Sequence, residues 1–506
     1  MTEIPVPGHA LHERFLRGLA LSPTRTAIRV DADSLTYEET HELALRRAGG
    51  LLALAPKGPQ DGYAVAVLAE KSLTAYVGIL AALYAGATVV PLNPLFPAER
   101  TRRMLAAAKV STVVADATGR AALEATGLDL PVLDEESTAT PLDFPRTVEP
   151  SDVAYVLFTS GSTGRPKSVP IPHSANAHYF ALLDQRYDFG PDDVFSQNVG
   201  INFDCAMFEL FCAWGNGSAV HAIPPAAHRD LAGFFAERGM TVWFSAPSGI
   251  SFARKTSGLK PESMPSLRYS FFAGEALLCD DAAEWQAAAP GSHVENLYGP
   301  TELTVTITGH RWSASSAERA VNGVVPIGAV HPGHDHLLLD DDGQPSDEGE
   351  LVVAGPQMTP GYLDEADNDG RFLEREGRRY YRTGDRVRDP GDGELVYLGR
   401  MDAQVQIQGF RVELAEVDHS LRQCEGVTNA ATVTRPAPAG GLELVVYYTG
   451  ERVSPVVLRR QLAAVLPDPM MPKAYLHVAE FPLNSNRKVD RGQLAREAAA
   501  LSDGHA

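Results

Sequence analysis

The sequence predicts a layered α/β protein of more than one domain. Residues 63–70 and 87–94 have the apolar pattern of buried strands, and the alanine-rich residues 71–86 between them read as a helix that ends at a glycine. Such alternation is typical of strand–helix–strand units with largely parallel sheets. A chain of 506 residues is also too long for one compact core, so we expect at least two domains.

The sequence pattern changes twice towards the C-terminus. Residues 336–364 and 378–400 read as strands interrupted by Gly, Pro and Asp, which predicts a smaller antiparallel or barrel-like region. From about residue 400 the pattern becomes strand, helix and strand again. This C-terminal part, on the order of 100 residues, has the size of a separate domain.

Composition narrows the class of protein. A net charge of −20 argues against a nucleic-acid partner, because a phosphate backbone would be repelled. The most apolar stretch, residues 76–92, is too short and too interrupted by glycine and proline to span a membrane, and the first fifteen residues do not resemble a signal peptide. The four cysteines lack metal-ligand spacing, so we expect reduced thiols in a cytoplasmic protein.

The stretch FTSGSTGRPKS, residues 158–168, predicts a phosphate-binding loop. Its glycines and hydroxyl side chains let the backbone wrap closely around phosphate, and residues 153–158 deliver it at the end of a buried strand. It is not the P-loop of nucleoside triphosphatases, since Pro166 occupies the position where that motif requires glycine. A Ser/Gly surface linker is the alternative.

The whole chain resembles the adenylate-forming enzymes, which include acyl- and aryl-CoA synthetases, luciferases and the adenylation domains of nonribosomal peptide assembly. The resemblance depends on ten segments that occur in the family's order and spacing. They are residues 35–39, 83–100, 155–173, 202–211, 272–277, 296–302, 349–363, 381–385, 399–418 and 481–491. It implies a large N-terminal adenylation domain (1–400), with two layered α/β subdomains and a small β-barrel-like one, and a small mobile α+β C-terminal domain (401–506).

The resemblance implies a two-step reaction and assigns residues to it. A carboxylate attacks the α-phosphate of ATP and releases pyrophosphate, and a thiol then attacks the acyl adenylate. Thr301 suits the α-phosphate, Glu302 suits Mg²⁺, and Lys488 would bridge the substrate carboxylate and the α-phosphate. The residues implied to bind ATP or AMP are Thr159, Ser160, Gly161, Ser162, Thr163, Gly164, Lys167, Gly274, Glu275, Ala276, Asn296, Tyr298, Asp385 and Arg400.

The two steps need different surfaces against one nucleotide, and the resemblance implies that the C-terminal domain swings about a hinge at Asp402. Gln406 and Gln408 depart from the family's pattern, which carries basic residues there. The departure puts in doubt the usual carrier or CoA contacts of this loop, but not the adenylation.

Asp204 indicates that the substrate is an amino acid. Amino-acid-activating members of the family use an aspartate here to pair with the α-ammonium, whereas a buried carboxylate without a cation is costly. The alternative is an aspartate that caps the following helix. The other residues aligned with the substrate pocket are Cys205, Phe208, Phe244, Phe271, Ala273, Leu297, Val305 and Thr306.

This pocket is apolar and partly filled by three phenylalanines, which disfavours charged side chains and leaves room for a compact one. Segments 241–248, 271–277 and 297–305 are most similar to stand-alone L-prolyl-AMP ligases. We therefore expect L-proline or a proline analogue, with alanine or another small neutral amino acid as the alternative. We see no carrier or condensation motif, so the thiol should come from a separate molecule. We expect a peptidyl carrier protein with a phosphopantetheine arm, as in natural-product biosynthesis, with CoA as the alternative.

Two other functions remain open from the sequence. An acyl- or aryl-CoA ligase would use the same ATP chemistry, but Asp204 argues against it. A non-catalytic nucleotide-binding relative is the third possibility, and the joint presence of Lys488, Glu302 and Asp385 argues against it.

Overall fold

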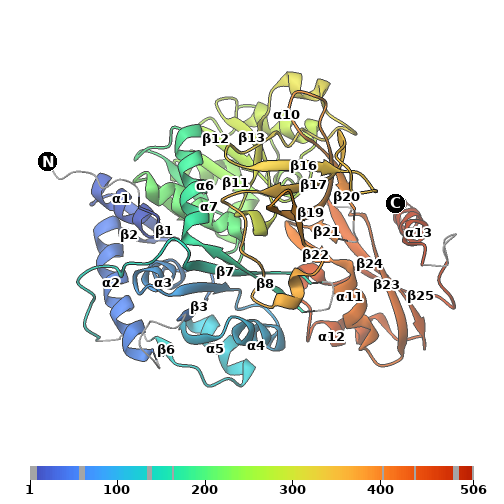
Figure 1. The fold of residues 1–506 in the computed structure, drawn as a ribbon, viewed down its shortest axis with the longest axis horizontal. Helices are drawn as coiled ribbons and strands as arrows, with labels where there is room; N and C mark the ends of the chain where they lie inside the picture. The colour runs from blue at the N-terminus through green and yellow to red at the C-terminus, as the bar shows by residue number, and fades with distance from the viewer. Residues whose placement is uncertain are drawn as a thin grey trace.

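A computed structural model of the chain describes residues 8–55, 63–133, 139–161, 165–401, 404–437, 440–482 and 489–503. Two large α/β layers, a smaller antiparallel sheet and a C-terminal α+β unit make up this structure (Figure 1). The predicted α/β architecture is confirmed. The predicted boundary at residue 400 falls between β20 (Val396–Arg400) and β21 (Gln404–Ile407).

The first large sheet has six strands in the order β6-β5-β3-β4-β7-β8, all parallel except for the antiparallel β7–β8 pair. Ser72 begins α3 by accepting the N–H of Ala75, and every residue from Thr74 to Tyr84 is buried, as expected for a helix that is apolar all round. The elements are α2 (Tyr37–Leu54), β3 (Ala64–Leu68), α3 (Leu73–Tyr84), β4 (Thr88–Leu92), α4 (Ala98–Ala107), β5 (Val110–Ala115), α5 (Ala117–Thr126), β6 (Val132–Leu133), β7 (Val153–Thr159) and β8 (Lys167–Pro172).

The second large sheet has nine strands in the order β15-β14-β13-β12-β11-β9-β10-β1-β2. Its six central strands are parallel, so the loops that follow them meet at one edge, where ligands bind in open α/β sheets. The strands are β1 (Thr26–Val30), β2 (Asp33–Thr36), β9 (Val194–Gln197), β10 (Ala219–Ala222), β11 (Val242–Ser245), β12 (Tyr269–Phe272), β13 (His293–Tyr298), β14 (Thr308–Arg311) and β15 (Ala329–Val330). The helices are α1 (Glu13–Leu21), α6 (His173–Arg186), α7 (Asp204–Gly215), α8 (Leu231–Arg238), α9 (Ser248–Thr256) and α10 (Cys279–Ala288).

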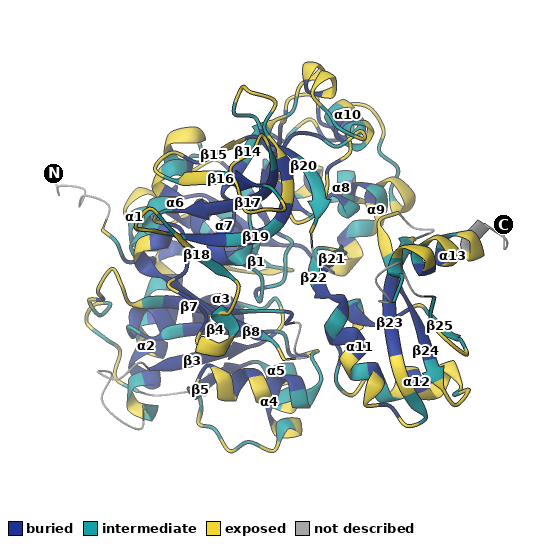
Figure 2. Cartoon of the chain, turned by 45° about the vertical axis from the view of Figure 1, so that its right-hand side comes forward, coloured by how far each residue is buried: buried dark blue, intermediate teal, exposed yellow. Residues whose placement is uncertain are grey.

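The smaller sheet is antiparallel, and β19 lies between β17 and β18 and also pairs with β20. The C-terminal unit begins with the hairpin β21–β22 and continues into a three-stranded sheet, in which the middle parts of β23 and β24 are buried and β25 is half-buried (Figure 2). The remaining elements are β16 (Asp335–Leu339), β17 (Glu348–Ala354), β18 (Phe372–Arg375), β19 (Arg378–Arg388), β22 (Phe410–Glu413), α11 (Leu414–Arg422), β23 (Val427–Pro436), β24 (Leu442–Gly450), α12 (Pro455–Leu462), β25 (Ala474–His477) and α13 (Arg491–Asp503).

The three-stranded sheet of the C-terminal unit has an apolar cluster on each face. Alternate residues of β24 separate them: Leu444 and Val446 pack with α11, α12 and the hairpin, whereas Val445 and Tyr447 pack with α13. Phe481 and Val489, which flank residues 483–488, belong to the α13 side. The hairpin and the residues that flank Lys488 therefore lie on opposite faces of one sheet.

All four cysteines are unpaired. Among the described residues, no helix has both the length and the apolar content that crossing a membrane requires.

Candidate functional site

A cavity of about 710 Å³ opens where the loops after β12 and β13 meet the smaller sheet and the hairpin β21–β22. The parallel order of β11, β12 and β13 brings these loops to one edge. Eight residues predicted to bind nucleotide or substrate line this cavity: Gly274, Glu275, Ala276, Asn296, Leu297, Tyr298, Asp385 and Arg400. Segments more than 120 residues apart in the sequence thus meet in one site.

Asp385 is held by two partners inside the cavity. The Tyr298 hydroxyl donates to its Oδ2 at 2.6 Å, and Arg400 approaches its Oδ1 at 2.8 Å across the β19–β20 pair. Burial raises the pKa of Asp385, and the opposing effect of Arg400 is smaller. A carboxylate fixed in this way can accept hydrogen bonds from a diol such as a ribose.

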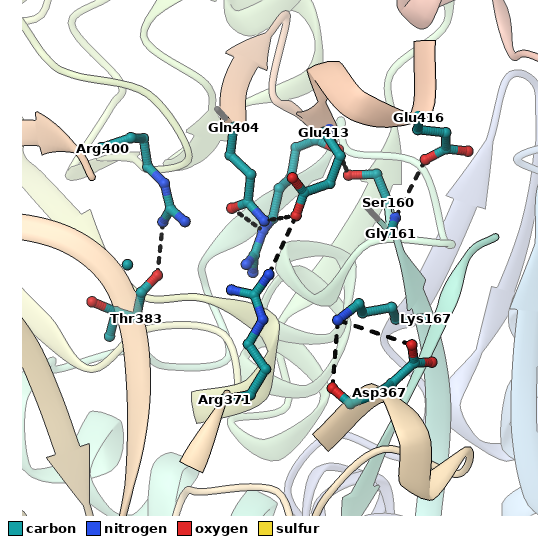
Figure 3. A network of polar contacts seen from close by, with 12 residues as sticks. Ser160, Gly161, Lys167, Asp367, Arg371, Thr383, Arg400, Gln404, Glu413 and Glu416 are labelled. Atoms are coloured by element: carbon teal, nitrogen blue, oxygen red, sulfur yellow. Dashed lines mark hydrogen bonds and ion pairs between the residues drawn. The ribbon is translucent and has the colours of Figure 1, made fainter. Parts of the chain in front are cut away.

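The predicted phosphate loop follows β7, but Ser162, Thr163 and Gly164 lie outside the described residues. Lys167 stands opposite Thr159 in the antiparallel β7–β8 pair, and its side chain is buried. Its ammonium lies 5.0 Å from the ring centroid of Tyr362 and 3.5 Å from the carbonyl oxygen of Asp367 (Figure 3). Burial, with the nearby Arg371, lowers the pKa of Lys167.

The hairpin of the C-terminal unit reaches into the same site (Figure 3). The Ser160 hydroxyl donates to the carbonyl oxygen of Arg411 at 2.7 Å and accepts the N–H of Glu413 at 3.0 Å. The Arg411 guanidinium donates to Glu302 Oε2 at 3.0 Å. The phosphate loop and the predicted magnesium ligand therefore both contact this hairpin.

Two further carboxylates, those of Glu416 and Glu275, hold the C-terminal unit in this arrangement. Glu416 Oε1 pairs with Arg100 of α4 at 2.6 Å, with both side chains buried, and its Oε2 accepts the N–H of Gly161 at 3.3 Å. Glu275 joins the two parts as well, because its carboxylate accepts the N–H groups of Ser248 and Gly409 at 2.8 and 2.9 Å.

Glu302 is fully buried beside Thr301. Burial alone would raise the pKa of Glu302, but the Arg411 guanidinium and the Tyr362 hydroxyl, which donates at 2.6 Å, leave it below its usual value. The Thr301 side chain lies near Asp204 and opposes the rise of the pKa of Asp204 that burial causes. Thr301 and Glu302 thus connect the cavity with the predicted amino-acid pocket.

Asp204 is the first residue of α7, and the cap position belongs to Phe203, so the alternative role as a helix cap is not seen. Its side chain is buried, and burial raises its pKa to about 6, although hydrogen bonds with Thr301 and Cys205 act in the opposite direction. Within the described residues, Asp204 forms no ion pair with a Lys, Arg or His side chain.

Three phenylalanines form the wall behind Asp204. The ring centroid of Phe208 lies 5.0 Å from those of Phe244 and Phe271, which are 6.2 Å from each other. Phe244 and Phe271 pair in register on β11 and β12, so they face α7 together, whereas Trp243 and Phe272 pack on the other face of the sheet. The same cluster contains Ala273, Leu297 and Val305, with Cys205 packed against it, and Thr306 lies 3.0 Å from the Tyr179 hydroxyl.

Some predicted residues are not placed, and several contacts in the site were not predicted. Lys488 and Asp402 lie outside the described residues. Gln406 lines the cavity, whereas Gln408 is exposed in the hairpin turn at φ +52°. Arg411 and Glu416 occur in the segment 399–418 that the sequence singled out, but the pattern gives no sign of their partners Glu302 and Arg100.

Comparison with known proteins identifies the family. The family described as AMP-binding enzyme matches residues 15–363. The chain is 36% identical to the L-proline--[L-prolyl-carrier protein] ligase of Streptomyces coelicolor, and the match covers 93% of each chain. It is 34% identical to surfactin synthase subunit 2 of Bacillus subtilis over 97% of this chain, and spans only 14% of that protein.

Two solved structures are similar over nearly the whole chain. IdnL7 is 50% identical, with a TM-score of 0.74, and the match covers 98% of this chain and 100% of that one. The Vibrio cholerae adenylation domain AlmE, solved with glycyl-adenosine-5'-phosphate, is 28% identical, with a TM-score of 0.83, and covers 96% of this chain and 98% of its own.

Proposed function

Because the chain belongs to the AMP-binding enzyme family, we propose that it activates a small neutral amino acid and passes it to a carrier protein. The amino-acid carboxylate attacks the α-phosphate of ATP, forming an aminoacyl adenylate and releasing pyrophosphate. The phosphopantetheine thiol of a separate carrier protein then attacks the acyl carbon, and AMP leaves. The observation that carries this proposal is the buried Asp204 behind the nucleotide cavity.

A substrate ammonium would balance the charge of Asp204. An opposite charge within hydrogen-bonding distance lowers the pKa of a buried carboxylate and offsets the cost of its burial. An acyl or aryl acid has no such group and would leave the carboxylate uncompensated. Asp204 therefore supports an amino acid over the acids used by CoA ligases.

The wall of Phe208, Phe244 and Phe271 favours a compact substrate side chain, since three rings in mutual contact fill much of the volume behind Asp204. L-Proline is our first candidate, because it is compact and apolar and carries a secondary ammonium. The printed name of the Streptomyces coelicolor relative supports this choice, and the glycyl ligand of AlmE supports a small amino acid in general. Alanine is the alternative.

The remaining residues receive roles around the nucleotide. Asp385 and Arg400 would hold the ribose, Gly274, Ala276, Asn296 and Tyr298 would surround the adenine, and Lys167 would add positive charge near the phosphates. The described residues include no group of three or more His, Cys, Asp and Glu that could hold a metal, so Mg²⁺ would bind Glu302 and share the phosphate oxygens as ligands. The ion would then neutralise charge on the phosphates. Because the Arg411 guanidinium donates to Glu302 in this structure, it would have to move away before the ion binds.

An amino-acid panel in an ATP–pyrophosphate exchange assay tests the proposal. We expect exchange to depend on the amino acid and to be highest with L-proline or a close analogue, with alanine and glycine as the next candidates. Benzoate and acetate serve as controls for the CoA-ligase alternative. Exchange with benzoate or acetate alone would contradict the assignment of Asp204, and no exchange with any acid would favour a non-catalytic nucleotide-binding protein.

A further inference from the structure

Glu209, on α7 one and a half turns after Asp204, lies outside the machinery described so far. Its side chain is 1% exposed. Its carboxylate accepts the N–H of Asn198 at 2.8 Å and the N–H of Val199 at 3.1 Å, with further hydrogen bonds from Ser196 and Gln197. It therefore ties the start of the β9–α7 connection, residues 198–203, back to the helix that carries Asp204.

Lys71 holds the same connection from the other sheet. It follows β3, and its ammonium donates to the carbonyl oxygens of Gln197 and Asn198. Tyr76 of α3 adds a hydrogen bond from its hydroxyl to Gln197 Oε1 at 2.6 Å. Two successive peptide units, 197–198 and 198–199, are thus held from both sides. Glu209 accepts their N–H groups and Lys71 donates to their C=O groups, which fixes the direction in which the backbone leaves β9.

Packing supports the connection on one side, where Ile201 is 3% exposed within the main apolar cluster and Val199 packs against that cluster, and the other side is open. Gly200, Ile201 and Asn202 line a second cavity of about 450 Å³, whose wall also includes Lys71. Side chains that border a cavity have few partner atoms on that side. The polar contacts of Lys71 and Glu209 therefore act together with the packing of Ile201, and with the turn in which the Phe203 N–H bonds the Gly200 carbonyl oxygen at 3.0 Å, to position residues 198–203.

We infer that Glu209 and Lys71 are positioning residues for amino-acid recognition: Glu209 on α7 and Lys71 after β3 together hold the β9–α7 connection and so fix Asp204 where the substrate amine would bind. The inference rests on the proposed function. Neither residue lines the nucleotide cavity, so the clamp acts on the amino-acid side of the site. Asp204, at the start of α7, lies between the two ends of the segment that Glu209 closes through the N–H groups of Asn198 and Val199.

The test compares steady-state exchange kinetics of four variants with the wild type. For Glu209→Gln and Lys71→Met we expect the KM for the amino acid to rise at least about tenfold. Gln offers one acceptor oxygen where Glu209 offers two, and Met offers no donor, so buried backbone groups lose their partners. The KM for ATP should stay within about twofold. Lys71→Arg, which keeps the charge and the donors, should restore much of the amino-acid KM. Asp193→Asn is the matched control: this buried carboxylate binds Gly190, Thr241 and Arg268 at the opposite end of β9, and its loss should leave both KM values alone.

Several outcomes would overturn the inference. The pair would be a general stabiliser of the core if both KM values rose equally or if the amino-acid KM stayed unchanged. The same would follow if neither Glu209→Gln nor Lys71→Met gave folded protein. An Asp193→Asn variant with the same selective defect would show that any buried carboxylate bound at an end of β9 has this effect. The wild-type enzyme in the same assay tests the proposed function separately, through its dependence on an amino acid.

Discussion

At the scale of single residues, Asp204 combines a functional advantage with a cost in stability. Its carboxylate is buried, and its pKa is raised to about 6 mainly by that burial. The folded state therefore holds the proton more tightly than the unfolded chain. The raised pKa of Asp204 therefore adds to the free energy of unfolding. This contribution is fully present below about pH 4 and is lost as the pH rises through 6. Near neutral pH the folded protein carries a charge that only a cation would balance.

Asp204→Asn should therefore stabilise the protein while it removes activity. We expect the free energy of unfolding at pH 7.5 to rise by roughly 1–3 kcal/mol, as a pKa shift of about two units implies, and the gain to disappear near pH 4. Amino-acid-dependent exchange should fall at least about a hundredfold, because the ammonium loses its counter-charge. Urea unfolding at the two pH values measures the first effect. A variant no more stable than wild type at pH 7.5 would contradict it.

The sequence identifies site residues better than it identifies their contacts. Asp385, Tyr298 and Arg400 were each selected from a short motif, because residue types and spacing persist in a local pattern. Their mutual hydrogen bonds depend on how β13, β19 and β20 pack, which no local pattern contains. For the same reason Lys71 and Glu209 were missed: their segments read only as a helix start and a buried helix.

At the scale of elements, the hairpin β21–β22 and the following helix α11 connect the C-terminal unit to the site. Ser160 and Glu302 contact the hairpin, and Arg100 on α4 pairs with Glu416 on α11. The strand–helix–strand order of β3, α3 and β4 could be predicted from apolar periodicity. The Arg100–Glu416 contact could not, because it joins residues 316 positions apart through the packing of one unit on another.

Removing the Arg100 side chain should impair the second half of the reaction selectively. Arg100→Met leaves Glu416 buried without its cation, which disfavours this arrangement of the C-terminal unit. We expect thiol transfer to a carrier protein to slow by about tenfold or more while pyrophosphate exchange changes little. Arg103→Met on the same helix is the control, since among the described residues Arg103 pairs with the neighbouring, partly exposed Glu99 and not with the C-terminal unit. A slowed exchange with normal transfer would mean that the arrangement serves the first half instead.

At the scale of the whole molecule, the C-terminal unit presents two different surfaces. The hairpin packs on one face of the β23–β24–β25 sheet, and Phe481 and Val489, which flank Lys488, pack on the other. With the hairpin against Glu302, helix α13, which covers that second face, lies on the other side of β23 and β24 from the hairpin (Figure 2). The hinge predicted at Asp402 would let the unit turn and exchange the two surfaces.

Lys488→Ala should therefore separate the two halves of the reaction. We expect pyrophosphate exchange to fall by orders of magnitude while ATP still binds, because the variant lacks the charge that would join the carboxylate and the α-phosphate. Transfer from a supplied aminoacyl adenylate should remain near the wild-type rate, since the hairpin surface is unchanged. The exposed Lys473 of the same unit provides the control variant. Unchanged exchange would exclude Lys488 from adenylation.

The opposed surfaces of this small sheet have a pharmacological consequence. A compound that stabilises the hairpin against Ser160 and Glu302 would also keep the other surface away from the cavity. Such an inhibitor would block adenylate formation without resembling ATP or the amino acid. A higher concentration of either substrate would reduce the inhibition only if that substrate binds more tightly when the C-terminal unit has turned.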